Sequence, residues 1–162
     1  MLCVAPDAHY DPAMRRRRAP LALAASALAL GACGANDERL PDACTEGPAA
    51  VRHALAAAPG KVRLSGVPLS NCLRENADAA ELQTVGAAFT NVAGELSQKA
   101  IRDPEGEEAL RLGYLLGAAR RGAAHTQGIH SELVHRLEQE VTSVDRHSDA
   151  LGRGERAGRR WG

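Results

Sequence analysis

Imidazole and carboxylate side chains in the C-terminal half are the first groups in this sequence that could do chemistry. His125, His130 and His135 recur every five residues. Five residues rotate an α-helix by about 140° beyond a full turn, so these rings cannot meet at one metal ion without a second element. Glu132 and His135, three residues apart, share one helix face and form the best-placed pair of metal ligands.

The Glu132-x-x-His135 spacing resembles half of the di-iron motif of ferritin-like helical bundles. That family needs a second such motif and two further helical glutamates facing it. The preceding predicted helix offers Glu81 and Glu95 and no histidine. We therefore predict no metal site and no cofactor, and keep Glu132 and His135 as weak candidates for metal binding.

No other arrangement of residues in the sequence indicates catalysis. There is no Gly-x-Ser-x-Gly motif around a nucleophilic serine, and the glycine-rich stretches lack the Gly-Lys-Ser/Thr ending of a phosphate-binding loop. The carboxylate pairs Glu107-Glu108 and Glu138/Glu140 fit a solvated helix face. We predict no catalytic residues and a protein that is not an enzyme.

Residues 1–32 have the pattern of a secretory signal peptide. Residues 15–18 are four arginines, and residues 19–32 follow without a charge. As a helix this run spans roughly 21 Å, short of the ~30 Å hydrocarbon core of a bilayer. A basic block, a short apolar run and a small-residue exit predict a signal peptide. Met14, directly before the arginines, is an alternative start, so whether residues 1–13 are translated stays open.

The end of this segment, Leu30-Gly31-Ala32-Cys33, resembles the lipobox of bacterial lipoproteins. In that family the cysteine thiol receives a diacylglyceryl group, and the chain is cut just before the cysteine. The resemblance covers the first 33 residues and implies a lipidated Cys33. It places the protein on the extracytoplasmic face of the cell membrane, where two or three acyl chains hold a protein stably.

Two other export routes remain open. A secretory cut after Ala27-Leu28-Ala29 would release a soluble protein. The arginine block also fits a twin-arginine signal in part, although no Ser or Thr precedes it and no Phe-Leu follows it.

The number of cysteines favours lipidation. Cys3 is lost with the leader, so lipidation of Cys33 leaves Cys44 and Cys72, which are an even pair. A free Cys33 would leave an odd thiol in an oxidising compartment. We predict a structural disulfide between Cys44 and Cys72.

Hydrophobic spacing predicts a flexible tether over 33–44 and a helical domain over 45–144. The first helix begins at Thr45, carries Pro48 in its first turn and ends at Pro59-Gly60. Residues 61–69 are predicted to be an extended connector, because an isolated strand there would lack a partner.

A second helix is predicted from a capping box at Asp78-x-x-Glu81 to about Arg102. Its apolar residues follow a heptad seam: Leu82, Val85, Phe89, Val92 and Leu96. A third helix could run from Glu105 to about Val144. Its glycines at 113, 117, 122 and 128 cost about 1 kcal/mol each relative to alanine. They indicate a close backbone approach, most simply to small residues of the second helix, or a kink between 122 and 128.

In the C-terminal segment 145–162, the residues after Asp145 include five arginines against Asp149 and Glu155, with four glycines. This composition predicts a basic, disordered tail. In an alternative interpretation the arginines contact anionic lipid headgroups or a cell-wall polymer.

Composition limits the remaining function classes. Aromatic residues make up 2% of the chain and the formal net charge is zero, which argues against a β-barrel and against a nucleic-acid partner. The predicted fold is all-α, a helical hairpin or three-helix bundle with one short disulfide-stapled helix and two long antiparallel helices. We expect a non-enzymatic, lipid-anchored envelope protein that interacts with a partner or a second copy through its helix seam. The alternative is a metal- or small-ligand-binding helical bundle.

Overall fold

The computed structural model describes residues 38–145 and 147–162, so the predicted signal peptide, Met14 and Cys33 lie outside the described residues. The described residues belong to one unit, Gly34–Gly162. They are mostly helical, as expected for an all-α fold. The elements in chain order are η1 (Asp42–Thr45), α1 (Pro48–Leu55), β1 (Arg63–Leu64), β2 (Val67–Pro68), η2 (Leu69–Leu73), α2 (Ala79–Ala100), α3 (Glu107–Gly122), α4 (Ile129–Val141) and α5 (Asp149–Trp161).

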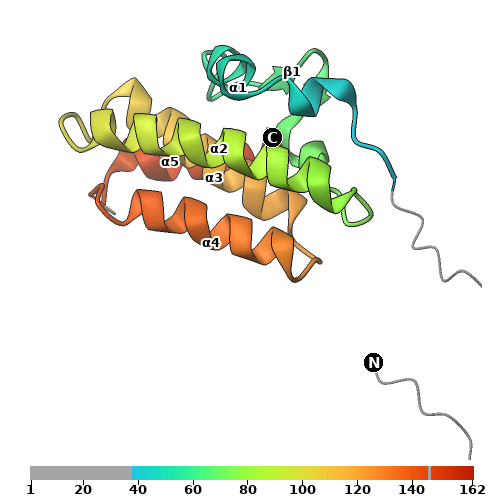
Figure 1. Ribbon diagram of the computed structural model, residues 1–162. Coiled ribbons are helices and arrows are strands. Elements are labelled where there is room, and N and C mark those ends of the chain that lie inside the picture. The colour runs from blue at the N-terminus through green and yellow to red at the C-terminus, as the bar shows by residue number, and fades with distance from the viewer. Residues whose placement is uncertain (1–37, 146) are drawn as a thin grey trace, which may run out of the picture. The chain divides into compact units, whose positions relative to one another are not determined.

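Helices α2 to α5 form the body of the fold, with α1 and the β1–β2 hairpin lying over one side of it (Figure 1). Helix α2 packs on α3 and α4, and α3 packs most extensively on α5. The largest fully buried side chains include Tyr114, Phe89 and Leu55. This core and the disulfide both lie within the described residues of the unit Gly34–Gly162. The unit therefore has what a domain needs to fold by itself.

The start of α2 and its apolar seam agree with the sequence pattern. The Asp78 carboxylate accepts hydrogen bonds from the backbone nitrogens of Ala80 (2.9 Å) and Glu81 (3.1 Å), as an N-cap residue does. The Glu81 carboxylate does not complete a capping box, because it accepts a hydrogen bond from Leu40 N at 2.7 Å. All five seam residues are at most 6% exposed. The seam is thus buried within a single copy of the chain.

The long third helix expected over 105–144 is wrong. The chain forms two helices, α3 and α4, joined by a turn over 123–128. Gly128, directly before α4, has φ +66°, a left-handed conformation that a helix interior excludes and glycine adopts without strain. The chain reverses direction there, so α4 runs antiparallel to α3 and packs beside α2 (Figure 1). The two-long-helix arrangement is therefore replaced by a four-helix body.

The disordered tail expected over 145–162 is also wrong, because residues 149–161 form α5. The Ser148 hydroxyl caps this helix by accepting a hydrogen bond from Leu151 N at 3.0 Å. Asp149 lies in the first turn and Arg159 and Arg160 in the last, which are the placements that the helix dipole favours. Two of the glycines that suggested disorder, Gly154 and Gly158, are the residues through which this helix packs on α3.

Helices α3 and α5 meet backbone to backbone through two pairs of glycines. A Cβ at Gly113 or Gly117 would overlap the carbonyl oxygen of Leu151 or Glu155 on α5. A Cβ at Gly154 or Gly158 would overlap a carbonyl oxygen of α3. Higher residue numbers on one helix face higher numbers on the other, so the two helices run parallel. The close approach expected from the sequence is confirmed, but the partner is α5 rather than the small residues of α2.

The N-terminal part of the described chain is packed rather than flexible. Leu40 is 3% exposed, and Glu38 forms a bridge with Ala77. Residues 42–45 form η1. The expected tether over 33–44 is therefore wrong for residues 38–44, because Leu40 and Cys44 enter the core.

Residues 61–69 contain a strand pair that the sequence interpretation excluded. Strand β1 pairs with β2 in antiparallel register, and Ser65 and Gly66 make the turn with positive φ values of 44° and 92°. Each strand finds its partner inside the same short segment.

The disulfide between Cys44 and Cys72 is confirmed. Both cysteines are buried, and their Cα atoms are 5.4 Å apart. The bridge ties η1 to η2 and encloses α1, as the spacing of the two cysteines predicted.

Candidate functional site

A partly buried charged cluster lies where α3, α4 and α5 meet. The Arg120 guanidinium on α3 donates hydrogen bonds to Glu138 on α4 at 2.6 Å and, through another nitrogen, to Glu155 on α5. Arg159 also donates to Glu155, at 2.8 Å. These four side chains balance in charge and join three helices.

The pKa values in this cluster reflect that pairing. Burial works against the charged form of Arg120, but hydrogen bonds and charge from Glu138 and Glu155 outweigh it and raise the Arg120 pKa. Burial likewise opposes ionisation of Glu155, but Arg159 and Arg120 outweigh it and lower the Glu155 pKa. Both groups are held in their charged forms. Such a pair stabilises helix packing and supplies neither a general acid nor a general base near neutral pH.

Tyr114 is the third group with a perturbed pKa. Burial raises it, and the hydrogen bond from Val62 N to the phenolic oxygen (3.1 Å) acts in the opposite direction. The hydroxyl ties α3 to the segment before β1, which is a structural role.

A groove with a volume of about 600 Å³ lies between α2 and α4. Gly86 and Ala87 on α2 leave space there because their side chains are so small. Leu133 forms part of the α4 wall, and a charged pair, Glu132 and Arg136 (2.9 Å), lies at its edge. The groove can hold a small molecule with an apolar body.

The structure separates the two weak metal candidates. Glu132 lines the groove between α2 and α4, and its carboxylate is paired with Arg136. His135 lines a different hollow beside Arg120, where its Nε2 lies 3.1 Å from the side-chain nitrogen of Gln139. Among the described residues, no group of three or more His, Cys, Asp or Glu side chains is placed to hold a metal ion. The helical spacing alone did not show that Glu132 and His135 would face different hollows on either side of α4.

The other two histidines of the five-residue series are also apart from any shared centre. His130 is buried, and its Nε2 lies 2.9 Å from the Arg74 carbonyl oxygen. His125 lies in the exposed turn between α3 and α4. The three imidazoles therefore lie in separate parts of the fold.

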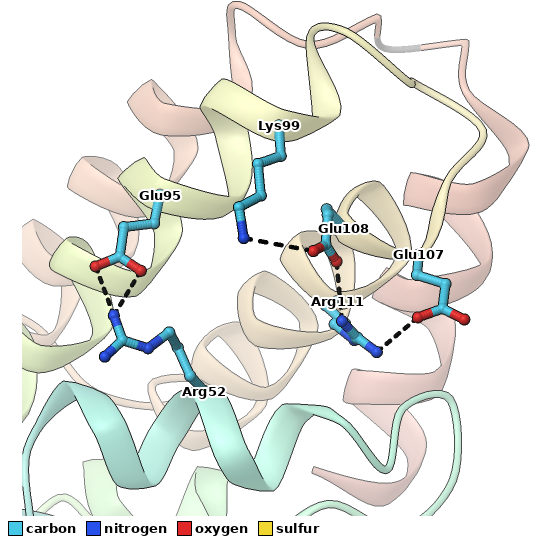
Figure 2. A network of polar contacts seen from close by, with 6 residues as sticks. All are labelled: Arg52, Glu95, Lys99, Glu107, Glu108 and Arg111. Atoms are coloured by element: carbon cyan, nitrogen blue, oxygen red, sulfur yellow. Dashed lines mark hydrogen bonds and ion pairs between the residues drawn. The ribbon is translucent and has the colours of Figure 1, made fainter.

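A second group of ion pairs lies on the surface where α1, α2 and α3 meet (Figure 2). Arg52 on α1 contacts both carboxylate oxygens of Glu95 on α2 at 2.6 Å. Arg111 on α3 is bonded to Glu107 and Glu108, and Glu108 also lies 3.6 Å from the Lys99 nitrogen on α2. The side chains of Arg52, Glu95 and Glu107 are exposed, whereas those of Arg111 and Glu108 are half-buried. The exposed pairs orient the helices with little net energy.

The exposed face of α5 carries arginines, which we call the arginine face: Arg153, Arg156 and Arg160. These positions are three and four residues apart, so they form one row along the helix. None of the three has an acidic partner within 4 Å among the described residues. The glycines at 154 and 158 lie against α3 on the opposite side.

Trp161 stands at the C-terminal end of the arginine face and is 40% exposed. The Arg160 guanidinium carbon lies 4.6 Å and the Lys61 nitrogen 5.4 Å from the centre of its ring. Arg121 lies against the same helix end, where it donates hydrogen bonds to the carbonyl oxygens of Arg159 and Arg160. Contact of these arginines with anionic lipid headgroups was the alternative interpretation of the sequence, but the helix that aligns them was not predicted, because the glycines indicated disorder. The spacing of the arginines opposite the glycines was the available signal for that helix.

Comparisons with protein-family models, with curated proteins and with solved structures give no match to this chain. No α-helix in the described ranges, 38–145 and 147–162, is long and apolar enough to cross a membrane.

Proposed function

We propose that this chain is an exported, lipid-anchored protein of the cell envelope with a non-enzymatic binding role. Its anchor is a diacylglyceryl group on Cys33, which holds the helical domain on the extracytoplasmic face of the membrane. The observation that carries the proposal is the buried Cys44–Cys72 disulfide. Structural disulfides are typical of proteins folded in an oxidising compartment, as an exported chain is.

The position of the folded unit supports the same proposal. The unit begins at Gly34, directly after the cysteine of the lipobox-like segment. Cleavage before Cys33 would leave all the described core residues, from Leu40 to Leu151, in the mature chain. The three perturbed pKa values in the described residues belong to groups that hold parts of the fold together, which is consistent with a binding role.

A partner surface would have to lie outside the heptad seam. The seam residues are occupied within one copy of the chain, so a second copy cannot bury them. The exposed surfaces that offer a partner something to bind are the groove between α2 and α4 and the arginine face of α5.

The test of the anchor is the intact mass of the protein extracted in detergent from its own host, with and without reductant. We expect a chain that starts at Cys33 and carries a diacylglyceryl adduct. Its mass should rise by two hydrogens when the disulfide is reduced. Cys33→Ser is the matched control, because it leaves the disulfide intact and removes the acylated thiol. A lipid-free wild-type chain that begins near Leu30 would contradict the proposal.

A second candidate function is the binding of a small apolar ligand, and the groove between α2 and α4 favours it. Ala87 is exposed and lines the groove, so the phenyl ring of Ala87→Phe would occupy it. The control is Ala124→Phe, which places the same ring in the exposed turn before α4. The fluorescent probe 8-anilinonaphthalene-1-sulfonate should bind the wild type and the Ala124→Phe variant and lose affinity for Ala87→Phe. Equal binding to all three proteins would refute a ligand site in the groove.

A further inference from the structure

We propose that the arginine face of α5, together with Trp161 and Lys61, is a docking surface for the anionic phospholipid headgroups of a bilayer. The part of the inference that places this surface near a membrane rests on the proposed lipid anchor. The part that concerns charge and chemistry rests on the described residues alone.

The charge pattern selects an anionic partner. Arg153, Arg156 and Arg160 are exposed and have no acidic partner within 4 Å among the described residues, whereas most other arginines of the helical body are paired with glutamates. Glu155, the acid in the middle of α5, is turned toward Arg120 and Arg159. Asp149 lies at the opposite end of the helix from Trp161. A row of free guanidinium groups suits phosphate oxygens, which they can bind through two parallel hydrogen bonds.

Trp161 distinguishes a membrane from other anionic partners. Within 38–145 and 147–162, the large exposed hydrophobic residues are Ile101 and Trp161. The Lys61 and Arg160 cations both lie over the indole ring, 5.4 and 4.6 Å from its centre. Tryptophan favours the boundary between headgroups and acyl chains, because its ring is apolar and its N–H is polar. An aromatic ring framed by cations fits that boundary.

The attachment of the chain brings this end of α5 toward the anchor. Four residues lie between Cys33 and Glu38, which makes five steps along the chain, so at most about 18 Å of extended chain joins the acylated residue to the first packed one. Glu38 N donates to the Asn76 carbonyl oxygen, and Arg74 is paired with Glu38. At the other end of the same short segment, the Ser70 hydroxyl donates to the Gly162 carbonyl oxygen at 2.6 Å. The anchored end of the domain and the Trp161 end of α5 therefore contact one segment, residues 70–76.

The test uses the chain that begins at Gly34, with its disulfide formed, and vesicles with equal parts of phosphatidylglycerol and phosphatidylcholine. This chain lacks Cys33, so its binding cannot come from an acyl anchor. We expect it to sediment with these vesicles at low salt and to be released as the salt concentration rises. It should not bind vesicles of pure phosphatidylcholine. Trp161 is the single tryptophan of the sequence, so its emission should shift to shorter wavelength on binding.

The decisive variant is Arg153→Gln/Arg156→Gln/Arg160→Gln, which should weaken binding about a hundredfold, since each basic residue near an anionic surface contributes roughly fivefold. The matched control is Arg52→Gln/Arg102→Gln/Arg136→Gln, which removes the same charge from exposed sites on other elements. The control should bind within a few-fold of wild type. Circular dichroism should show that both variants are folded.

Three results would overturn the inference: equal losses in the two triple variants, equal binding to charged and neutral vesicles, or binding to soluble polyphosphate without binding to vesicles. The last result would assign the arginine face to an anionic polymer. Failure of the anchor is measured separately by the intact mass, so the two proposals can fail independently.

Discussion

Alanine substitutions at two glycines of α5 should change stability in opposite directions. Gly154 faces the backbone of α3, whereas Gly152, two residues earlier, faces away from it. Replacing glycine by alanine within a helix ordinarily stabilises it by up to about 1 kcal/mol. We expect that gain at Gly152 and a net loss at Gly154.

The magnitudes follow from what each new methyl group would meet. At Gly152 the nearest atom is the Arg156 guanidinium at 3.3 Å, the mobile end of an exposed side chain, so most of the gain is kept. At Gly154 the methyl would overlap the Leu110 carbonyl oxygen and lie 2.9 Å from the Tyr114 nitrogen, both of them backbone atoms. Relief requires the two helices to separate. Overpacking of this kind costs about 1–3 kcal/mol or more, and lost Cα–H···O contacts add to it.

The assay is urea unfolding of the chain that begins at Gly34, monitored by far-ultraviolet circular dichroism. The free energy of unfolding should rise by about 0.5–1 kcal/mol for Gly152→Ala and fall by about 2 kcal/mol for Gly154→Ala. A difference of that size separates the two midpoints by roughly 1–2 M urea. Equal effects at the two positions would refute the packing of α5 on α3, and no effect at either position would restore the disordered tail expected from composition.

Three further results follow from the bonds and ion pairs. The Cys44→Ala/Cys72→Ala variant should lose roughly 3.6 kcal/mol of unfolding free energy, because the bridge spans a sequence separation of 28; an unchanged urea midpoint would contradict this. The native pKa of Glu155 lies below its unfolded value, so its stabilisation is complete above pH ~4.3 and is lost as the pH falls through the lower native pKa. Glu155→Gln should therefore have a lower urea midpoint than wild type at pH 7, and the gap should narrow at pH ~3; a constant gap would refute the ionic origin. Arg52→Ala removes an exposed pair with Glu95 and should change stability by no more than about 1 kcal/mol, measured in the same way.

The parts of the fold predictable from sequence were those marked by apolar side chains or by covalent chemistry. The α2 seam, the Asp78 cap and the Cys44–Cys72 bridge belong to this group. The spacing of apolar side chains indicates which face of a helix is buried. Once Cys3 and Cys33 are accounted for, the two cysteines that remain allow one pairing. The turn that ends α3 was half visible, since glycines at 122 and 128 suggested a kink but gave no measure of its size.

The tail was mispredicted for a physical reason. The buried face of α5 consists largely of Ala150, Gly154 and Gly158, which bury backbone rather than side chains. The arginines opposite this face make the segment amphipathic, but the face holds few large apolar side chains and glycine lowers helix propensity. The contact with α3 supplies the stability that local propensity lacks. The candidate ligand pair Glu132 and His135 could not be resolved either, because their separation depends on which helices flank α4.

The paired glycines also give a rule for recognising distant homologues of this protein. An apolar core position accepts other side chains of similar volume, so a core can drift in sequence while its shape persists. Gly113, Gly117, Gly154 and Gly158 have no such freedom, because a carbonyl oxygen of the facing helix occupies the place of any Cβ. A distant chain with this architecture would need two four-residue glycine steps separated by one intervening helix. That spacing, together with the two cysteines, should outlast the similarity of the rest of the sequence.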